Sequence, residues 1–139
     1  MKRSTSVFLI VLVFTFSSCE KESAGNPNLH GSWQSTTTDL TLTFRDGRFE
    51  AVHDDLPSHP GYLIYKGNYK LDGSNIYLTA EQAEGFDPMH MNVPIIVVYQ
   101  NTVSQHFKFK IRGESVEMTK ADEVVGEMSI PNGIYSKRY

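Results

Sequence analysis

The sequence predicts an all-β protein, a small up-and-down antiparallel β-barrel of about eight strands. Apolar and polar residues alternate with a period of two in several segments, and no segment keeps a helical period. Glycine-containing turn pairs separate these segments at short intervals. The part of the chain that carries them, about 110 residues, is long enough for one closed barrel with one core. Closure also removes the two long edges that an open sheet would expose.

The composition narrows the class of protein. The chain has 139 residues, 40% of them apolar and 21% charged, with a formal net charge of −3. These values fit one globular domain and exclude a disordered chain and a polytopic membrane protein. The mild acidity argues against a nucleic-acid partner. The single cysteine excludes an internal disulfide framework and a zinc site built from cysteines.

The N-terminus is typical of an export signal. Lys2 and Arg3 precede an apolar run over Val7–Phe16. Ten helical residues span roughly 15 Å, about half of a bilayer core, which is too short to cross it. The run therefore matches the apolar region of a signal peptide.

The next residues resemble a bacterial lipobox of the Bacteroidota type. Small residues, Ser17 and Ser18, stand directly before the single cysteine, Cys19. The resemblance implies that Cys19 becomes the mature N-terminus and carries acyl chains such as palmitate, which hold the protein to a membrane without spanning it. An ordinary secretory signal with an incidental cysteine is the alternative.

These features divide the chain into three parts. We expect a lipoprotein signal peptide over residues 1–18, the lipidated cysteine and a flexible linker over residues 19–29, and the barrel domain over residues 30–139. Without Lys2 and Arg3 the mature chain has 11 basic and 16 acidic residues, so the lipid anchor is its expected membrane contact. The expected location is the cell envelope, on the outer membrane, facing the periplasm or the surface.

Three turn pairs predict three hairpins. Asp46-Gly47 as the loop places Phe44 opposite Phe49 and Leu40 opposite His53, so the apolar residues of both strands share one face. Asp72-Gly73 as the loop places Tyr69 opposite Ile76 and Gly67 opposite Leu78. Gly113-Glu114 places Ile111 opposite Val116 and Phe109 opposite Met118.

Two further strands follow from the apolar pattern. Ile95–Tyr99 is a continuous apolar run, which indicates either a strand buried on both faces or a barrel wall that something covers. A last strand with Ile134 and Tyr135 follows the turn at Pro131-Asn132-Gly133.

The domain resembles bacterial lipocalin-like lipoproteins. Gly31-Ser32-Trp33 before the first strand, the Asp46-Gly47 hairpin and the stretch from Gly67 to Gly73 carry the resemblance. It implies that Trp33 plugs the closed end of the barrel and that a basic residue of the last strand stacks on it. Arg138 is the nearest match for that residue, and Arg112 is the alternative.

A small apolar ligand inside the barrel is the first expectation for function. A barrel of eight strands is either filled by its own side chains or holds one small ligand. A filled core is the alternative. The predicted ligand-binding residues are the large side chains of the inward face: Trp33, Phe44, Phe49, Tyr69, Phe107, Phe109 and Met118.

The predicted loops offer further candidate sites. The break between strands over Glu81–Val93 is either a lid over the barrel mouth or a packed loop. Met89-His90-Met91 offers soft ligands for copper. His53, Asp54, Asp55 and His59 form a possible metal cluster or a solvated loop. We predict no metal and no cofactor.

No motif indicates catalysis. The chain has neither a Gly-x-Ser-x-Gly nor a His-Glu-x-x-His sequence, and its adjacent carboxylates would point to opposite faces of a strand. We therefore predict that the protein is not an enzyme. The alternative to a ligand carrier is a protein-interaction module, such as an envelope inhibitor or an accessory lipoprotein with a packed core, whose protein partner the sequence does not identify.

Overall fold

The fold comes from a computed structural model, which describes residues 29–56, 59–88, 93–121, 126, 128 and 130–139. The predicted signal peptide, the lipobox-like stretch and Met89-His90-Met91 lie outside the described residues, so these remain predictions. Within the described part of the chain, no helix is long and apolar enough to cross a membrane.

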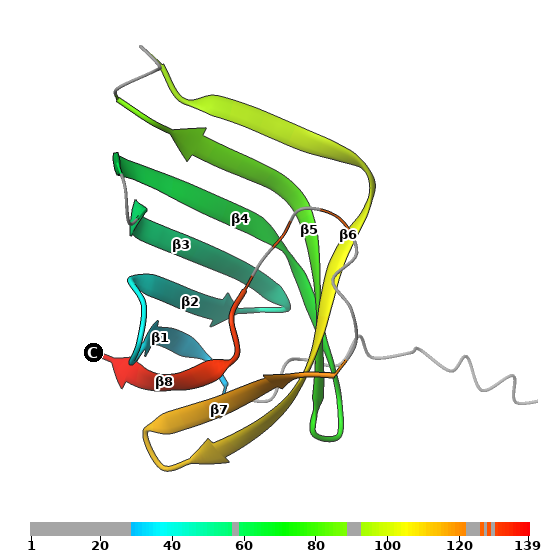
Figure 1. The fold of residues 1–139 in the computed structure, drawn as a ribbon. Coiled ribbons are helices and arrows are strands. Elements are labelled where there is room, and N and C mark those ends of the chain that lie inside the picture. Colours follow the sequence, from blue (N-terminus) through cyan, green and yellow to red (C-terminus); the bar gives the residue numbers. More distant parts are fainter. Residues whose placement is uncertain (1–28, 57–58, 89–92, 122–125, 127, 129) are drawn as a thin grey trace, which may run out of the picture.

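Eight antiparallel strands form a closed barrel, which confirms the predicted fold class (Figure 1). Each strand pairs with the next along the chain, and the last pairs with the first, as expected for an up-and-down barrel. The strands are β1 (Gly31–Ser35), β2 (Leu40–Arg45), β3 (Arg48–Leu56), β4 (His59–Asp72), β5 (Asn75–Phe86), β6 (Ile95–Arg112), β7 (Ser115–Lys120) and β8 (Gly133–Arg138).

The hairpin registers are confirmed at two of the three predicted turns. Phe44 lies opposite Phe49 and Leu40 opposite His53 across the first turn, where Asp46 and Gly47 both have positive φ. Across the third turn, Phe109 lies opposite Met118.

The second turn differs from its prediction by one residue. Gly73 and Ser74 form the loop, so that Asp72 pairs with Asn75 and Tyr69 pairs with Leu78 instead of Ile76. The positive φ of Gly73 (58°) explains the shift, because the left-handed residue of the turn falls there. The predicted faces are unchanged, since the pairing moves by two residues.

Alternation along the strands separates the core from the surface. In β2 and β7 every second side chain is buried, as the period of two requires. Residues outside the strands complete the core, because Leu29, Met128 and Ile130 are also fully buried. The core comprises Leu29, Trp33, Leu40, Leu42, Phe44, Phe49, Ala51, Tyr65, Tyr69, Ile76, Leu78, Ala80, Ala83, Val103, Phe107, Val116, Met118, Met128, Ile130 and Tyr135.

The three longest strands bend at a common level, where their registers shift. Gly67 pairs with Ala80 while Lys66 pairs with Gln82, so Glu81 of β5 is left as a bulge. On the other side of β5, residues 99–102 of β6 lie opposite Glu81 alone. These irregularities accompany the sharp bend of β6 in Figure 1, above which β5 and β6 extend away from β7.

Two sequence predictions about this region are corrected. β5 continues to Phe86, so the first half of the predicted loop Glu81–Val93 is strand. The run Ile95–Tyr99 is a strand, but four of its side chains are neither buried nor covered by the described residues: Ile95, Ile96, Val97 and Val98 are 48–64% exposed. The strand is confirmed, and the alternative of burial on both faces was wrong, because continuous apolarity does not by itself mean burial.

Gly67 is the residue at which a side chain should be least tolerated. A Cβ atom at Gly67 would lie 1.9 Å from the backbone oxygen of Thr79, whereas one at Gly85 in β5 would lie 3.7 Å from the Leu63 side chain. We expect Gly67→Ala to lower the free energy of unfolding by about 3 kcal/mol, because backbone has to move. Gly85→Ala, the matched control, should change it by less than about 1 kcal/mol. Urea denaturation of both variants checks this, and equal effects would contradict it.

Candidate functional site

The predicted ligand-binding residues lie together inside the barrel. Trp33, Phe44 and Phe107 have no exposed surface, and Met118, Phe49 and Tyr69 are at most 7% exposed. Phe109, the seventh, is partly buried and packs against the same core. The structure thus brings all seven side chains to the inner face, as the register argument predicted.

Trp33 is held at two points. Its indole Nε1–H donates to the backbone oxygen of Leu29 at 2.9 Å, which fixes the chain that enters β1. The ammonium of Lys137 lies 5.6 Å from the centre of the Trp33 ring, within the range of a cation–π contact.

The basic residue over Trp33 is therefore Lys137, and the expectation of Arg138 or Arg112 was wrong. Trp33 pairs with Lys137 between β1 and β8, so both side chains share the inner face. Arg138 follows on the opposite face and is exposed. Arg112 instead lies 3.7 Å from the Glu117 carboxylate on the outside of the barrel.

Tyr69 carries an isolated polar group. Its ring packs edge-on against Phe44, with the ring centres 5.1 Å apart. Its hydroxyl is buried and has no hydrogen-bond partner among the described residues. Burial raises the pKa of Tyr69, an effect that the Gly47 backbone opposes in part. An unpaired buried hydroxyl costs free energy, so this position is open to a polar partner.

The segment between β7 and β8 contributes Met128 and Ile130 to the core, and Gln105 holds it there. The Gln105 side chain accepts from the Ile130 N–H at 2.8 Å and donates to the Ile130 backbone oxygen at 3.2 Å. The Tyr135 hydroxyl donates to the Pro131 oxygen at 2.8 Å, and burial raises the pKa of Tyr135. These bonds pair the buried backbone of a segment that belongs to no strand.

Gln105 is a structural residue that was not among the residues predicted from the sequence. Gln105 lies between Val103 and Phe107 in an alternating stretch of β6, and all three are buried. A polar side chain at an inward position of that alternation was the available signal, because a buried amide needs partners. Its partner, Ile130, is 25 residues away and was not predictable from local pattern.

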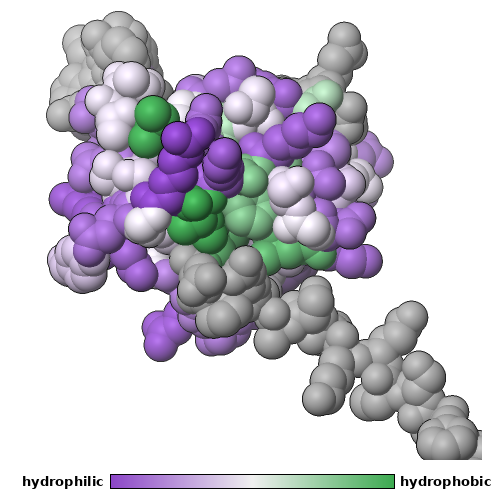
Figure 2. Space-filling model, turned by 90° about the horizontal axis from the view of Figure 1, so that it is seen from below, coloured by the Kyte–Doolittle hydropathy of each residue, from purple (hydrophilic) through white to green (hydrophobic). Residues whose placement is uncertain are grey.

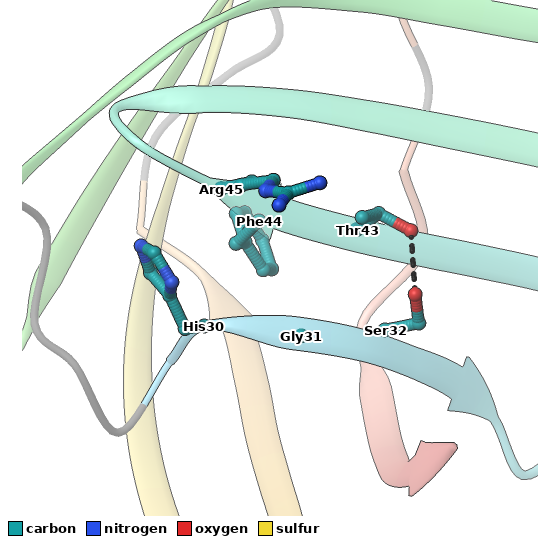
Figure 3. A pocket seen from close by; sticks show the side chains of 6 residues that line it. All are labelled: His30, Gly31, Ser32, Thr43, Phe44 and Arg45. Atoms are coloured by element: carbon teal, nitrogen blue, oxygen red, sulfur yellow. Dashed lines mark hydrogen bonds between the residues drawn. The ribbon is translucent and has the colours of Figure 1, made fainter. Parts of the chain in front are cut away.

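A shallow cavity of about 390 Å³ lies at the β1–β2 pair (Figure 3). His30, Gly31 and Ser32 line it from one side, and Thr43, Phe44 and Arg45 line it from the other. A hydrogen bond of 2.9 Å joins the Ser32 and Thr43 hydroxyls across the strands. The cavity is open and lined mainly by polar groups, so it lacks the enclosure of a site for an apolar ligand.

Of the predicted metal cluster, the structure describes the side chains of His53 and Asp54, which point to opposite faces of β3. His53 lies on the inner face opposite Leu40, its ring edge-on to Tyr65, and burial lowers its pKa. Asp54, the next residue, is exposed. The side chains of Asp55 and His59 lie outside what the structure describes. Among the described residues, no three His, Cys, Asp or Glu side chains are grouped as metal ligands.

Polar groups on the outer face close a network over the bulge of β5. Arg48 donates to Glu81 at 2.7 Å and to Asn68 at 2.8 Å, and Asn68 donates to Glu81 at 2.6 Å. The hydrogen bond from Arg48 is the main cause of the lowered pKa of Glu81. This network binds three strands to one another and holds the bulge in place.

The outer surface differs from one region to another. The face seen from below is mostly hydrophilic, with a smaller hydrophobic area near its centre (Figure 2). The upper part of β6 is different, because Ile95–Val98 exposes aliphatic side chains on both faces of one strand. Val97 pairs with the buried Ala83, so Val97 and Ile95 are on the inner face, and Ile96 and Val98 are on the outer face.

Comparisons with known proteins add no relative. No family model matches the chain, and neither the curated proteins nor the solved structures contain a match.

Replacing Gln105 should loosen the segment between β7 and β8. We expect Gln105→Met to lower the free energy of unfolding by about 3 kcal/mol, because the N–H and C=O of Ile130 would be buried without partners. Gln34→Met, on a partly exposed position of β1, is the matched control and should have an effect below about 0.5 kcal/mol. Chemical denaturation measures both. If the two variants are equally stable, the hydrogen bonds between Gln105 and Ile130 have no structural role.

Proposed function

We propose that this protein is a lipid-anchored component of the cell envelope whose barrel is a packed scaffold, and that it acts through protein contacts on its outer surface. Of the two functions that the sequence left open, this is the protein-interaction module. The closed barrel supports the proposal, and the burial of its inward side chains is the observation that carries it.

The burial of the inner face supports a filled interior. A side chain beside a hollow keeps surface that a water molecule can touch. Trp33, Phe44 and Phe107 keep none, and the same holds for their inward neighbours Leu42 and Ile76. Met128 and Ile130 add two further side chains to this core. A drug-sized ligand needs a site of at least about 300 Å³, and the cavity of about 390 Å³ described at the β1–β2 pair is open and lined mainly by polar groups.

The likeness to lipocalins supports the proposed barrel architecture and does not by itself support a bound ligand. The eight-stranded up-and-down barrel, the buried Trp33 before β2 and the cation over its ring all agree with that likeness. The folds of such barrels serve many functions, so the site has to decide between them.

A second candidate, a small apolar ligand within the barrel, is favoured by one observation. The Tyr69 hydroxyl is buried without a partner beside the Phe44 ring. A ligand that displaced part of the core could accept or donate a hydrogen bond there.

Native mass spectrometry distinguishes the two candidates. We expect the domain from residue 20 onward, purified without detergent, to show the mass of the chain without a bound molecule. Tyr69→Phe should likewise show the mass of its own bare chain and should raise the free energy of unfolding by up to about 1 kcal/mol, because it removes an unpaired buried hydroxyl. A retained small molecule that Tyr69→Phe releases would overturn the proposed function and support the ligand carrier.

The lipid anchor has a separate test. We expect the full chain, expressed in a diderm bacterium fed a clickable palmitate analogue, to take up the label and to fractionate with membranes. Cys19→Ala should abolish both, because it removes the thiol that would be acylated. Thr36→Ala, an exposed position after β1, is the control and should label as the parent does. Labelling that survives Cys19→Ala would show that the cysteine is not the site.

A further inference from the structure

The upper part of β6 combines an apolar surface with a strand edge that no described strand pairs with. In the described part of the chain, β5 is the strand that pairs with Ile95–Val98, while β7 pairs with β6 only from Phe107 onward. Figure 1 shows this part of β6 as the outermost strand of the sheet. Backbone N–H and C=O groups on the free side of such a strand are a template for another strand.

This edge strand lacks the charged side chains that protect most edges. Charged side chains normally block edges, and the thirteen residues from Val93 to Gln105 carry none. The bulge at residues 99–102 lies below the exposed segment and leaves Ile95–Val98 regularly paired with β5. Four consecutive aliphatic residues, each about half or more exposed, are then left on two faces. Such a segment combines high β-propensity with no charge, which favours pairing with a further strand.

The backbone decides what kind of partner fits. A bilayer offers no hydrogen-bond partners for open strand edges, so a lipid surface would leave the N–H and C=O groups of this edge unpaired. The occupant has to be a β-strand. It also has to be uncharged and aliphatic on both faces, because Ile95 and Val97 are on one face and Ile96 and Val98 on the other.

We propose that the occupant is the same strand of a second copy of this chain, paired antiparallel with Ile95–Val98 about a two-fold axis. Self-pairing places aliphatic residues opposite aliphatic residues on both faces and brings no like charges together. Among the described residues, this is the one run of consecutive exposed aliphatic side chains, so the chain itself carries the complementary strand. The inference rests on the proposed function, since it names the partner of an outer-surface contact.

The size of the contact sets its strength. Four residues from each copy form a small interface against the roughly 1,200–2,000 Å² that stable complexes bury. The dimer is therefore weak in dilute solution, with a micromolar or higher dissociation constant. Attachment of both copies to one membrane would raise their effective concentration and favour pairing.

Sedimentation of the domain from residue 20 onward tests the association. The described residues contain the whole barrel and its core, so this domain retains the fold. The sedimenting mass should rise from one chain toward two as concentration rises. Ile96→Lys and Val98→Lys should weaken this association at least about tenfold, because each places a charged side chain among the aliphatic residues of the contact. Ile134→Lys is the matched control, since Ile134 of β8 is 49% exposed and should leave the association unchanged.

Cross-linking of the full chain in the envelope tests the geometry. With Cys19 acylated, a second cysteine at the residue on the two-fold axis, Ile96 or Val97, should give a disulfide-linked dimer, and Glu117→Cys on β7 should not. Thermal melts of each variant confirm that the fold is retained.

Three results would overturn the inference: a single chain at every concentration, a cross-linked product that contains a different protein, or equal weakening by Ile134→Lys. Assemblies larger than two would also contradict it, because a two-fold contact closes on itself. A retained small molecule in the native mass overturns the proposed function. A bare mass with no dimer overturns this inference alone.

Discussion

The bend shared by β4, β5 and β6 is the constraint on which this structure depends. These strands have 14, 12 and 18 residues, whereas β1, β2, β7 and β8 have five or six. The long strands close a barrel with the short ones only by turning away from it above the level of closure. Gly67 permits the turn, since the Thr79 oxygen occupies the place of its missing Cβ. The Arg48–Glu81 ion pair spans the bulge from outside.

Closure below the bend and a free edge above it are two consequences of one arrangement. Below it, β6 pairs with β5 and β7, and most of the inner side chains are buried. Above it, β6 pairs with β5 on one side, and aliphatic residues remain exposed on both of its faces. The core of the closed part is packed with side chains. The part of β6 above the bend has an open edge that favours pairing with another strand.

Two polar side chains inside the barrel, Gln105 and Tyr69, have opposite effects on the stability of its core. Gln105 satisfies both backbone groups of Ile130, so the segment after β7 stays in the core without joining a strand. Tyr69 is the opposite case, because its hydroxyl is buried and lacks a partner among the described residues. One buried polar group thus stabilises the filled interior, and the other marks the position where a small molecule would find an unused hydrogen bond.

Features that depend on neighbouring residues were predictable from the chain alone. Alternation and turn chemistry gave the all-β class, the register at Asp46-Gly47 and the inner face that contains Phe44 and Phe107, because strand period and turn conformation are local properties. Features that depend on distant residues became visible in the folded protein. Lys137 rather than Arg138 covers Trp33 because β8 closes onto β1, and Gln105 finds Ile130 across 25 residues. The exposure of Ile95–Val98 was likewise hidden, since apolar residues record a preference for burial but not whether the fold supplies a cover.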